Sequence, residues 1–193
     1  MRRSVVLAVL TIAILLGGLA VVFGPDLLSR QGTARIGGPF TLSDGGGHVV
    51  TDQTFRGRWM LVYFGYTHCP DVCPTTLTTL TQALDALGQE HAAHVAPVFI
   101  TVDPERDTPE VVRDYVHAFD PRITGLSGTA AQVADAERAY RVYAARHPTK
   151  DGGYEMDHSS VIYVMGPDGD FVTVLGDDSK PQDIATKLRG LGA

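Results

Sequence analysis

The chain opens with a long apolar stretch and continues with short β-prone runs and segments of helical spacing. Residues 4–24 carry no charged side chain and follow Arg2 and Arg3. Because a helix of about 20 apolar residues spans a bilayer core, this stretch predicts one transmembrane helix. Arginines ahead of a span favour a cytoplasmic N-terminus, so the remainder is expected outside. The predicted parts are an anchor at 1–24, a linker at 25–35 and a domain at 36–193.

A cleaved signal peptide is the alternative interpretation of the same stretch. Gly18-Leu19-Ala20 is a poor match to a small-residue cleavage site, and apolar residues continue through Phe23. We therefore favour an uncleaved anchor over a removed leader. The domain is expected on the periplasmic side of the inner (cytoplasmic) membrane, held by a single span.

After the linker, turn signals separate several β-prone runs. Extended residues flank two glycine-containing turns, and each pair predicts a β-hairpin, at 40–51 and at 161–175. Two continuous apolar runs, at 59–64 and 95–102, are typical of strands that are buried on both faces of a sheet. The domain therefore has the strands for a central sheet.

Four segments have the spacing of amphipathic helices, at 75–87, 107–119, 129–146 and 180–188. Their order among the strands predicts an α/β fold in which a mixed central sheet is flanked by helices. A cysteine pair follows the first core strand and precedes the first helix, which is the arrangement of thioredoxin-like folds. The first hairpin would be an N-terminal extension of that fold.

Length and charge narrow the classes of function. The chain has 193 residues, room for one domain of about 150 residues with an appendage. Its net charge is −6 and its basic residues are scattered, so the sequence lacks the cluster of positive charge that attracts a nucleic-acid backbone. We therefore expect no nucleic-acid partner.

Cys69 and Cys73 are the only cysteines in the sequence. Outside the cytoplasm two such residues form a disulfide unless something keeps them reduced. A bridge across so short a loop would restrict little chain entropy, which makes it a weak structural link. Pro74 suits a first helical turn, so both sulfurs should lie near a helix N-terminus, where thiolates are favoured. A reactive or metal-binding pair is the better interpretation.

The spacing of the cysteines separates these uses. Three residues lie between Cys69 and Cys73, whereas disulfide exchangers of the thioredoxin type have two. Two thiolates and an imidazole suit copper, whose reduced form prefers soft ligands and whose oxidised form accepts nitrogen. Zinc is the alternative metal, but structural zinc usually takes four protein ligands and the sequence has no further cysteine.

The third ligand must come from elsewhere, and His158 is the strongest candidate. It lies just before the strand expected from Val161, where redox members of thioredoxin-like folds carry a cis-proline that faces the cysteines. No proline occurs between Thr149 and Gly166, which leaves the facing position to His158. Asp157 is expected to orient its ring or to supply charge behind it.

Other residues offer alternative roles beside this site. His68 adjoins Cys69, whose side chain already occupies that direction, and Met156 is simpler to interpret as packing than as a weak soft ligand. The five remaining histidines are most simply solvated. Asp103–Asp107 ends a core strand at the edge that carries the cysteines. It is a turn and helix cap, or it also holds the loop beside the metal.

Four motifs together resemble the Sco/SenC family of copper-binding proteins. They are Ile36–Phe40, Tyr63–Pro74, Val102–Pro109 and Asp157–Ser159, in the family's order. The resemblance implies a membrane-tethered copper metallochaperone that assists assembly of the binuclear copper site of cytochrome c oxidase. It implies Cys69, Cys73 and His158 as ligands of a Cu⁺ or Cu²⁺ ion. Its implied partners are the copper-site subunit of the oxidase and a copper donor protein.

Two other functions would use the same residues. With Cys69 and Cys73 as a catalytic redox pair, the chain would be a thiol-disulfide oxidoreductase that reduces the copper-site cysteines of the oxidase subunit. Thr67 shortly before Cys69 suggests a peroxidase of the peroxiredoxin type, but the spacing is one residue short of Thr-x-x-Cys. We expect a metallochaperone rather than an enzyme, with redox exchange as a companion activity.

Overall fold

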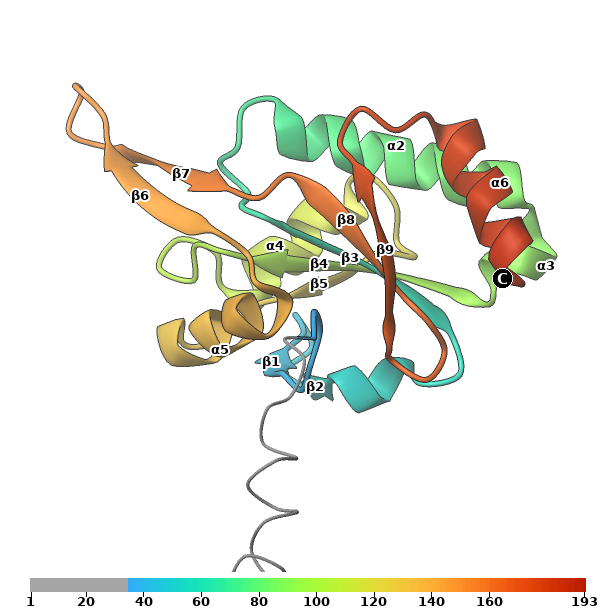
Figure 1. Ribbon diagram of the computed structural model, residues 1–193. Coiled ribbons are helices and arrows are strands. Elements are labelled where there is room, and N and C mark those ends of the chain that lie inside the picture. Colours follow the sequence, from blue (N-terminus) through green and yellow to red (C-terminus); the bar gives the residue numbers. More distant parts are fainter. Residues whose placement is uncertain (1–34) are drawn as a thin grey trace, which may run out of the picture. The chain divides into compact units, whose positions relative to one another are not determined.

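A five-stranded mixed sheet forms the centre of the computed structural model (Figure 1). Its strand order is β5-β4-β3-β8-β9. The central strand β3 pairs in parallel with β4 and antiparallel with β8, as a mixed sheet requires. The strands are β3 (Trp59–Gly65), β4 (Val95–Thr101), β5 (Thr124–Leu126), β8 (Val161–Met165) and β9 (Phe171–Gly176). The α/β fold with a mixed sheet that the sequence predicts is confirmed.

The structure describes residues 35–193, and Ile36–Ala193 form one compact unit. The anchor expected at 1–24, and all but the last residue of the linker expected at 25–35, lie outside the described residues. Among residues 35–193, no helix has the length and apolar character needed to cross a bilayer.

One face of the sheet is covered by three helices. Leu61 and Tyr63 of β3 point to this side and pack in a fully buried cluster with apolar residues of those helices. The helices are α2 (Val72–Leu87), α4 (Pro109–His117) and α6 (Pro181–Leu191). Thr108 caps α4 through its side chain and Pro109 occupies the first turn, as the sequence indicates.

The other face packs against the N-terminal hairpin and α5 (Ala130–Tyr140). Val62 and Phe64 point to this side because side chains alternate along a strand. This two-sided burial explains why β3 is an uninterrupted apolar run. The hairpin is β1 (Thr41–Ser43) with β2 (Val49–Thr51), followed by the short helix η1 (Asp52–Phe55); the short helix α3 (Gln89–Ala92) lies between α2 and β4.

A proline inside a core strand has a simple reason here. Pro97 pairs with Leu61 of β3 on one side, whereas β5 joins β4 only from Val98 onward. Pro97 therefore lies where β4 has a neighbour on one side only, and its missing amide hydrogen leaves no second strand without a donor.

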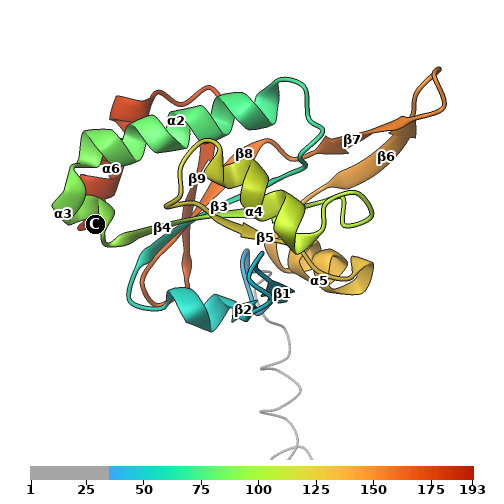
Figure 2. The same ribbon diagram turned by 180° about the vertical axis from the view of Figure 1, so that it is seen from behind.

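The helix expected at 129–146 is wrong beyond Tyr140. α5 ends there, and the next residue, Arg141, has a left-handed backbone with φ of 57°. The following residues form β6 (Ala144–Pro148), which pairs antiparallel with β7 (Tyr154–His158). Ladder hydrogen bonds to the next strand, β7, outweigh a weak local preference for helix. We call residues 144–158 the arm, since they project from the sheet in both views (Figures 1 and 2).

The C-terminal end of β3 and the base of the arm meet near the cysteine loop. Gly65 ends β3 opposite Thr101, the last residue of β4. His158 ends β7 and pairs with Ala144 at the base of the arm. The two hairpin strands β8 and β9 follow directly, as expected from the sequence.

Gly65 provides a test of how tightly β3 packs beneath the cysteines. A Cβ at this position would lie 2.7 Å from Cys73 Sγ and 2.9 Å from Phe99. We expect Gly65→Ala to lower the free energy of unfolding by about 1–3 kcal/mol in urea denaturation, because a packed core resists added volume. The control is Gly190→Ala in α6, where nothing lies within 4 Å. An equally stable Gly65→Ala variant would contradict the packing.

Candidate metal centre

Two sulfurs and one imidazole converge at the C-terminal end of β3. One ligand atom each from Cys69, Cys73 and His158 lies within 4.8 Å of the others. Cys73 Sγ and His158 Nε2 are 3.5 Å apart. Within residues 35–193, this is the one cluster of His, Cys, Asp and Glu side chains with the geometry to hold a metal ion. The structure therefore brings together the three candidate ligands, although the sequence separates His158 widely from the cysteines.

The cysteines occupy the turn between β3 and α2. Asp71 directly precedes α2, at the N-cap position, so Cys73 is the second helical residue and Pro74 the third. The amide of Cys73 points to Cys69 Sγ at 3.4 Å. A free amide at a helix N-terminus stabilises negative charge on such a sulfur. The helix therefore starts three residues earlier than expected and places both sulfurs near its N-terminus.

The two thiols have opposite tendencies to ionise. A hydrogen bond from the Cys73 thiol lowers the pKa of Cys69 to about 5, although partial burial opposes this shift. The same bond, together with burial, raises the pKa of Cys73 above its ordinary value. Cys69 is partly exposed, Cys73 is buried, and neither is in a disulfide. At neutral pH the pair therefore holds one accessible thiolate beside one buried thiol.

Backbone and aromatic contacts orient the imidazole of His158. Its Nδ1 lies 3.2 Å from the carbonyl oxygen of Ser159. Because a carbonyl can only accept, Nδ1 carries the proton, and in the neutral ring Nε2 presents its lone pair to the cysteines. The rings of Tyr63 and Tyr66 pack edge-on against the imidazole, with centroids 6.2 and 5.8 Å away.

The expected role of Asp157 is wrong. Its carboxylate lies 3.0 Å from His147 Nε2 instead of behind His158. Successive side chains of β7 point to opposite faces, so neighbouring residues cannot both face the cysteines. The carbonyl of Ser159 supplies the orienting contact that was assigned to Asp157.

Sequence reasoning missed a second residue behind the site. The hydroxyl of Tyr63 is buried and lies 3.7 Å from Cys73 Sγ, to which it donates a hydrogen bond. In the sequence, Tyr63 is one apolar position of a core strand. The alternation that points Tyr63 towards α2 could have marked it, but the contact itself depends on the packing of the helix over the sheet.

Asp107 holds the loop that carries the cysteines. Its carboxylate accepts hydrogen bonds from the backbone amide of Thr67 at 2.9 Å and from the Thr67 hydroxyl at 2.6 Å. A third donor is the hydroxyl of Thr101, at 2.7 Å. Asp103–Asp107 is thus more than a turn and helix cap, since it fixes a residue two positions before Cys69. The hydroxyl of Thr67, noted for peroxidase chemistry, serves this contact.

The alternative ligands lie outside the cluster. His68 is exposed and contacts Thr67 and the carboxylate of Asp107, the latter at 3.8 Å. Met156 is partly buried and packs against the apolar cluster on the α5 side of the sheet, which supports its interpretation as a packing residue. None of the other histidines among the described residues belongs to the cysteine cluster.

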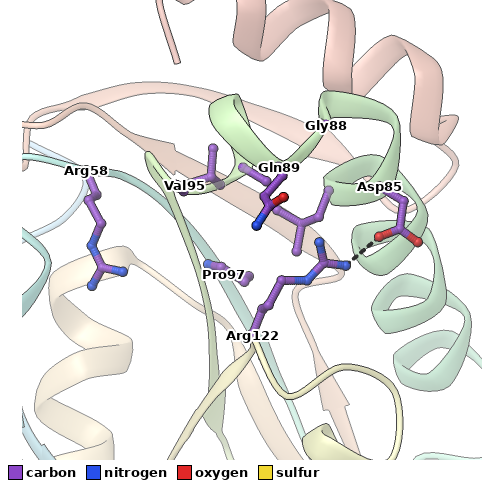
Figure 3. A pocket seen from close by; sticks show the side chains of 10 residues that line it. Arg58, Asp85, Gly88, Gln89, Val95, Pro97 and Arg122 are labelled. Atoms are coloured by element: carbon purple, nitrogen blue, oxygen red, sulfur yellow. Dashed lines mark hydrogen bonds and ion pairs between the residues drawn. The ribbon is translucent and has the colours of Figure 1, made fainter.

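A separate cavity of about 560 Å³ lies near the start of β4, away from the cysteine loop (Figure 3). Its walls include Val95 and Pro97, and the guanidinium of Arg122 reaches into it. That guanidinium is already paired with Asp85 at 2.6 Å and with Asp120 at 2.5 Å. No cysteine or histidine lines the cavity, so it adds nothing to the metal centre.

The fold and the cluster define a class of protein, a thioredoxin-like domain with two cysteines and one histidine at the end of a core strand. The family model SCO1/SenC matches residues 29–192. The chain therefore belongs to the SCO1/SenC family.

Similar proteins include the mitochondrial SCO1 homologue of Homo sapiens, which is 41% identical over 159 residues, or 81% of this chain and 53% of that protein. The chain spans about half the length of the first curated relatives that it matches. The structure of Bradyrhizobium japonicum ScoI with copper bound is similar with a TM-score of 0.75 and 48% identity, covering 80% of this chain and 98% of that one. The Arabidopsis thaliana ScoI structure with copper bound has a TM-score of 0.76 and 39% identity, covering 81% and 98%.

The asymmetry of the two thiols predicts selective alkylation by iodoacetamide. The rate at Cys69 should rise with pH through about 5, where its thiolate forms, and should be level at higher pH. Cys73 should react much more slowly because it is buried and protonated. Fragment-ion mass spectrometry assigns the modified sulfur, and Cys69→Ser is the control. A rate at Cys69 that climbs steadily to pH 9 would contradict the assignment.

Proposed function

We propose that the chain binds a copper ion through Cys69, Cys73 and His158 and acts as a copper metallochaperone. The observation that carries the proposal is the convergence of these three ligand atoms within 4.8 Å of one another. Two sulfurs and a neutral imidazole nitrogen form a donor set that suits both oxidation states of copper. Relatives whose structures contain copper share the fold at 48% and 39% identity.

Delivery rather than permanent storage fits the exposure of the site. Cys69 and His158 are both partly exposed, so a second protein can approach two of the three ligands. Three protein ligands also leave copper a position for a ligand from a donor or an acceptor. We infer handover by stepwise exchange of ligands, with the buried Cys73 as the last to release the ion.

The proposed acceptor is the copper-site subunit of cytochrome c oxidase, and the proposed source is a copper donor protein. Membership of the SCO1/SenC family supports the assembly of the binuclear copper site as the setting. The apolar stretch at 4–24 supports an anchor in the inner membrane, with the domain on the periplasmic side.

Replacing the imidazole tests the ligand set. His158→Ala should weaken copper binding at least about tenfold, since loss of even an outer-shell partner has effects of that order. Competition with a chelator measures the affinity. The Cu²⁺ spectrum should lose the signature of a nitrogen ligand. The matched control is His147→Ala on the opposite face of the arm, where the imidazole pairs with Asp157. Unchanged affinity and spectrum in His158→Ala would remove the third ligand from the proposal.

A second candidate function is thiol-disulfide exchange with the copper-site cysteines of the oxidase subunit. It is favoured by the accessible thiolate of Cys69 beside the buried thiol of Cys73. Cys69 would attack a partner disulfide and form a mixed disulfide, with one partner sulfur leaving as thiolate. Cys73 would then displace the second partner thiolate, so that the partner gains two electrons and Cys69 and Cys73 become a disulfide. A thiol donor would restore the pair.

The exchange can be tested by trapping its intermediate. We expect Cys73→Ser to accumulate a mixed disulfide with an oxidised copper-site subunit, because no second thiol remains to resolve it. Non-reducing electrophoresis and mass spectrometry detect the adduct. Cys69→Ser is the control and should trap far less, since Cys73 is buried. If neither variant traps the subunit and the wild type does not reduce it, the redox function is excluded.

A further inference from the structure

We propose that Tyr154 is a positioning residue for His158. Its ring is held between the guanidinium groups of Arg106 and Arg146, and this contact fixes the arm so that the imidazole stands opposite the cysteines. The inference rests on the proposed function, because it concerns the same copper site. It assigns a role to the arm, which the sequence did not predict.

The two guanidinium groups enclose the ring of Tyr154. The Cζ atom of Arg106 lies 3.7 Å from the ring centroid, and that of Arg146 lies 3.5 Å from it. Two guanidinium groups so close to one centroid cannot occupy the same face, so they stack on opposite faces. Both distances are far inside the range of about 6 Å within which a cation is attracted to an aromatic face.

The three residues of this stack come from three different segments. Arg106 belongs to the turn 103–107 after β4, Arg146 to β6 and Tyr154 to β7. Arg146 pairs with Met156 across the arm, so its side chain lies on the face that also carries Tyr154 and His158. The stack therefore joins both strands of the arm to the turn.

Hydrogen bonds hold the same components together. The hydroxyl of Tyr154 donates to Asp103 Oδ1 at 2.8 Å, and Arg106 Nη1 donates to the Tyr154 carbonyl at 3.1 Å. Arg106 Nε also donates to Asp103 Oδ2 at 2.5 Å, and Arg146 pairs with Glu105 at 2.8 Å. The two positive groups are thus each matched by a carboxylate of the turn, so the stack forms without a net excess of charge.

The turn 103–107 contacts both the cysteine loop and the arm that carries His158. At one end, Asp107 binds Thr67, two residues before Cys69. At the other end, Asp103 and Arg106 bind Tyr154, four residues before His158 on the same face of β7. Arg106 also lies 5.8 Å from the ring centroid of Tyr66 in the cysteine loop.

The arm needs such an attachment because its own structure is slight. It has two strands of five residues, and most of its side chains are exposed or only partly buried. A two-stranded hairpin alone is at best marginally stable in water. Its direction, and with it the position of His158, therefore depends on contacts to the domain.

The experiment compares copper binding by the purified full chain and its variants in a chelator competition. Tyr154→Leu removes the stack and the hydroxyl, and we expect roughly a tenfold loss of affinity with a weakened nitrogen signature in the Cu²⁺ spectrum. Tyr154→Phe keeps the aromatic faces and should retain most of the wild-type affinity for copper. Arg146→Gln removes one exposed cation and should cause a smaller loss, which keeps the test available if Tyr154→Leu folds poorly.

A double mutant separates positioning of His158 from a general effect on the fold. If Tyr154 acts through the imidazole, Tyr154→Leu should cause no further loss of affinity in a His158→Ala background. The matched control is Tyr143→Leu, since Tyr143 is 60% exposed next to the arm. It should leave affinity unchanged. Wild-type affinity in Tyr154→Leu, or an equal loss with and without His158, would overturn the inference.

A measurement without copper distinguishes this inference from the proposed function. In the metal-free chain, the NMR shifts of the His158 ring report its contacts with the rings of Tyr63 and Tyr66. They should move in Tyr154→Leu and stay in Tyr154→Phe. If they do so while the wild type fails to bind copper, the metallochaperone function is wrong and the positioning role stands. If they do not move in Tyr154→Leu, the positioning role is wrong whatever the copper affinity.

Discussion

The carboxylate of Asp107 is fully buried where the cysteine loop, the end of β4 and the start of α4 meet. A charge in such a place must be surrounded by hydrogen-bond donors, and it receives them from Thr67 and Thr101. The hydroxyl of Ser127 donates to the backbone carbonyl of Asp107 and connects that residue to the end of β5. A shift of the cysteine loop would therefore remove two of the three donors from a buried carboxylate. The rest of the metal centre is built on that fixed loop.

A fixed loop makes the two sulfurs different from each other. Cys73, the second residue of α2, is buried against the hydroxyl of Tyr63, whereas Cys69 is partly exposed just before the helix. The same asymmetry serves metal handover and disulfide exchange, because each requires one accessible thiolate and one sheltered partner. Copper binding and redox exchange are therefore two uses of one arrangement, and copper held by both sulfurs would block the exchange.

The imidazole is placed by a different kind of support. The arm has little apolar burial, so the polar and cation–π contacts of Tyr154, at the outer end of its two strands, set its direction. Such contacts are directional, which suits the task of aiming a ring. Beyond these contacts, residues 150–153 at the outer turn of the arm are exposed. Rigid burial thus holds the cysteines, and surface contacts hold the histidine.

The sequence by itself determined the core and most of the chemistry. The apolar runs of β3 and β4 and the spacing along α2 follow from local periodicity, which persists in any fold that buries those residues. The spacing of Cys69 and Cys73 before Pro74, with His158 ahead of a strand, was enough to propose the ligand set. Each of these features is a local pattern in the chain, although His158 itself is far in sequence from the cysteines.

Only the tertiary structure decided the arm, the partner of Asp157 and the contacts of Tyr63 and Tyr154. Residues 144–148 form β6 because they pair with β7, whereas their helical spacing alone predicted a continuation of the preceding helix. Asp157 pairs with His147 because the alternation along β7 places it on the face opposite to His158. A single sequence records the periodicity of each element, but it does not record which distant groups will share a buried carboxylate or an aromatic ring. Those contacts form only when the chain has folded.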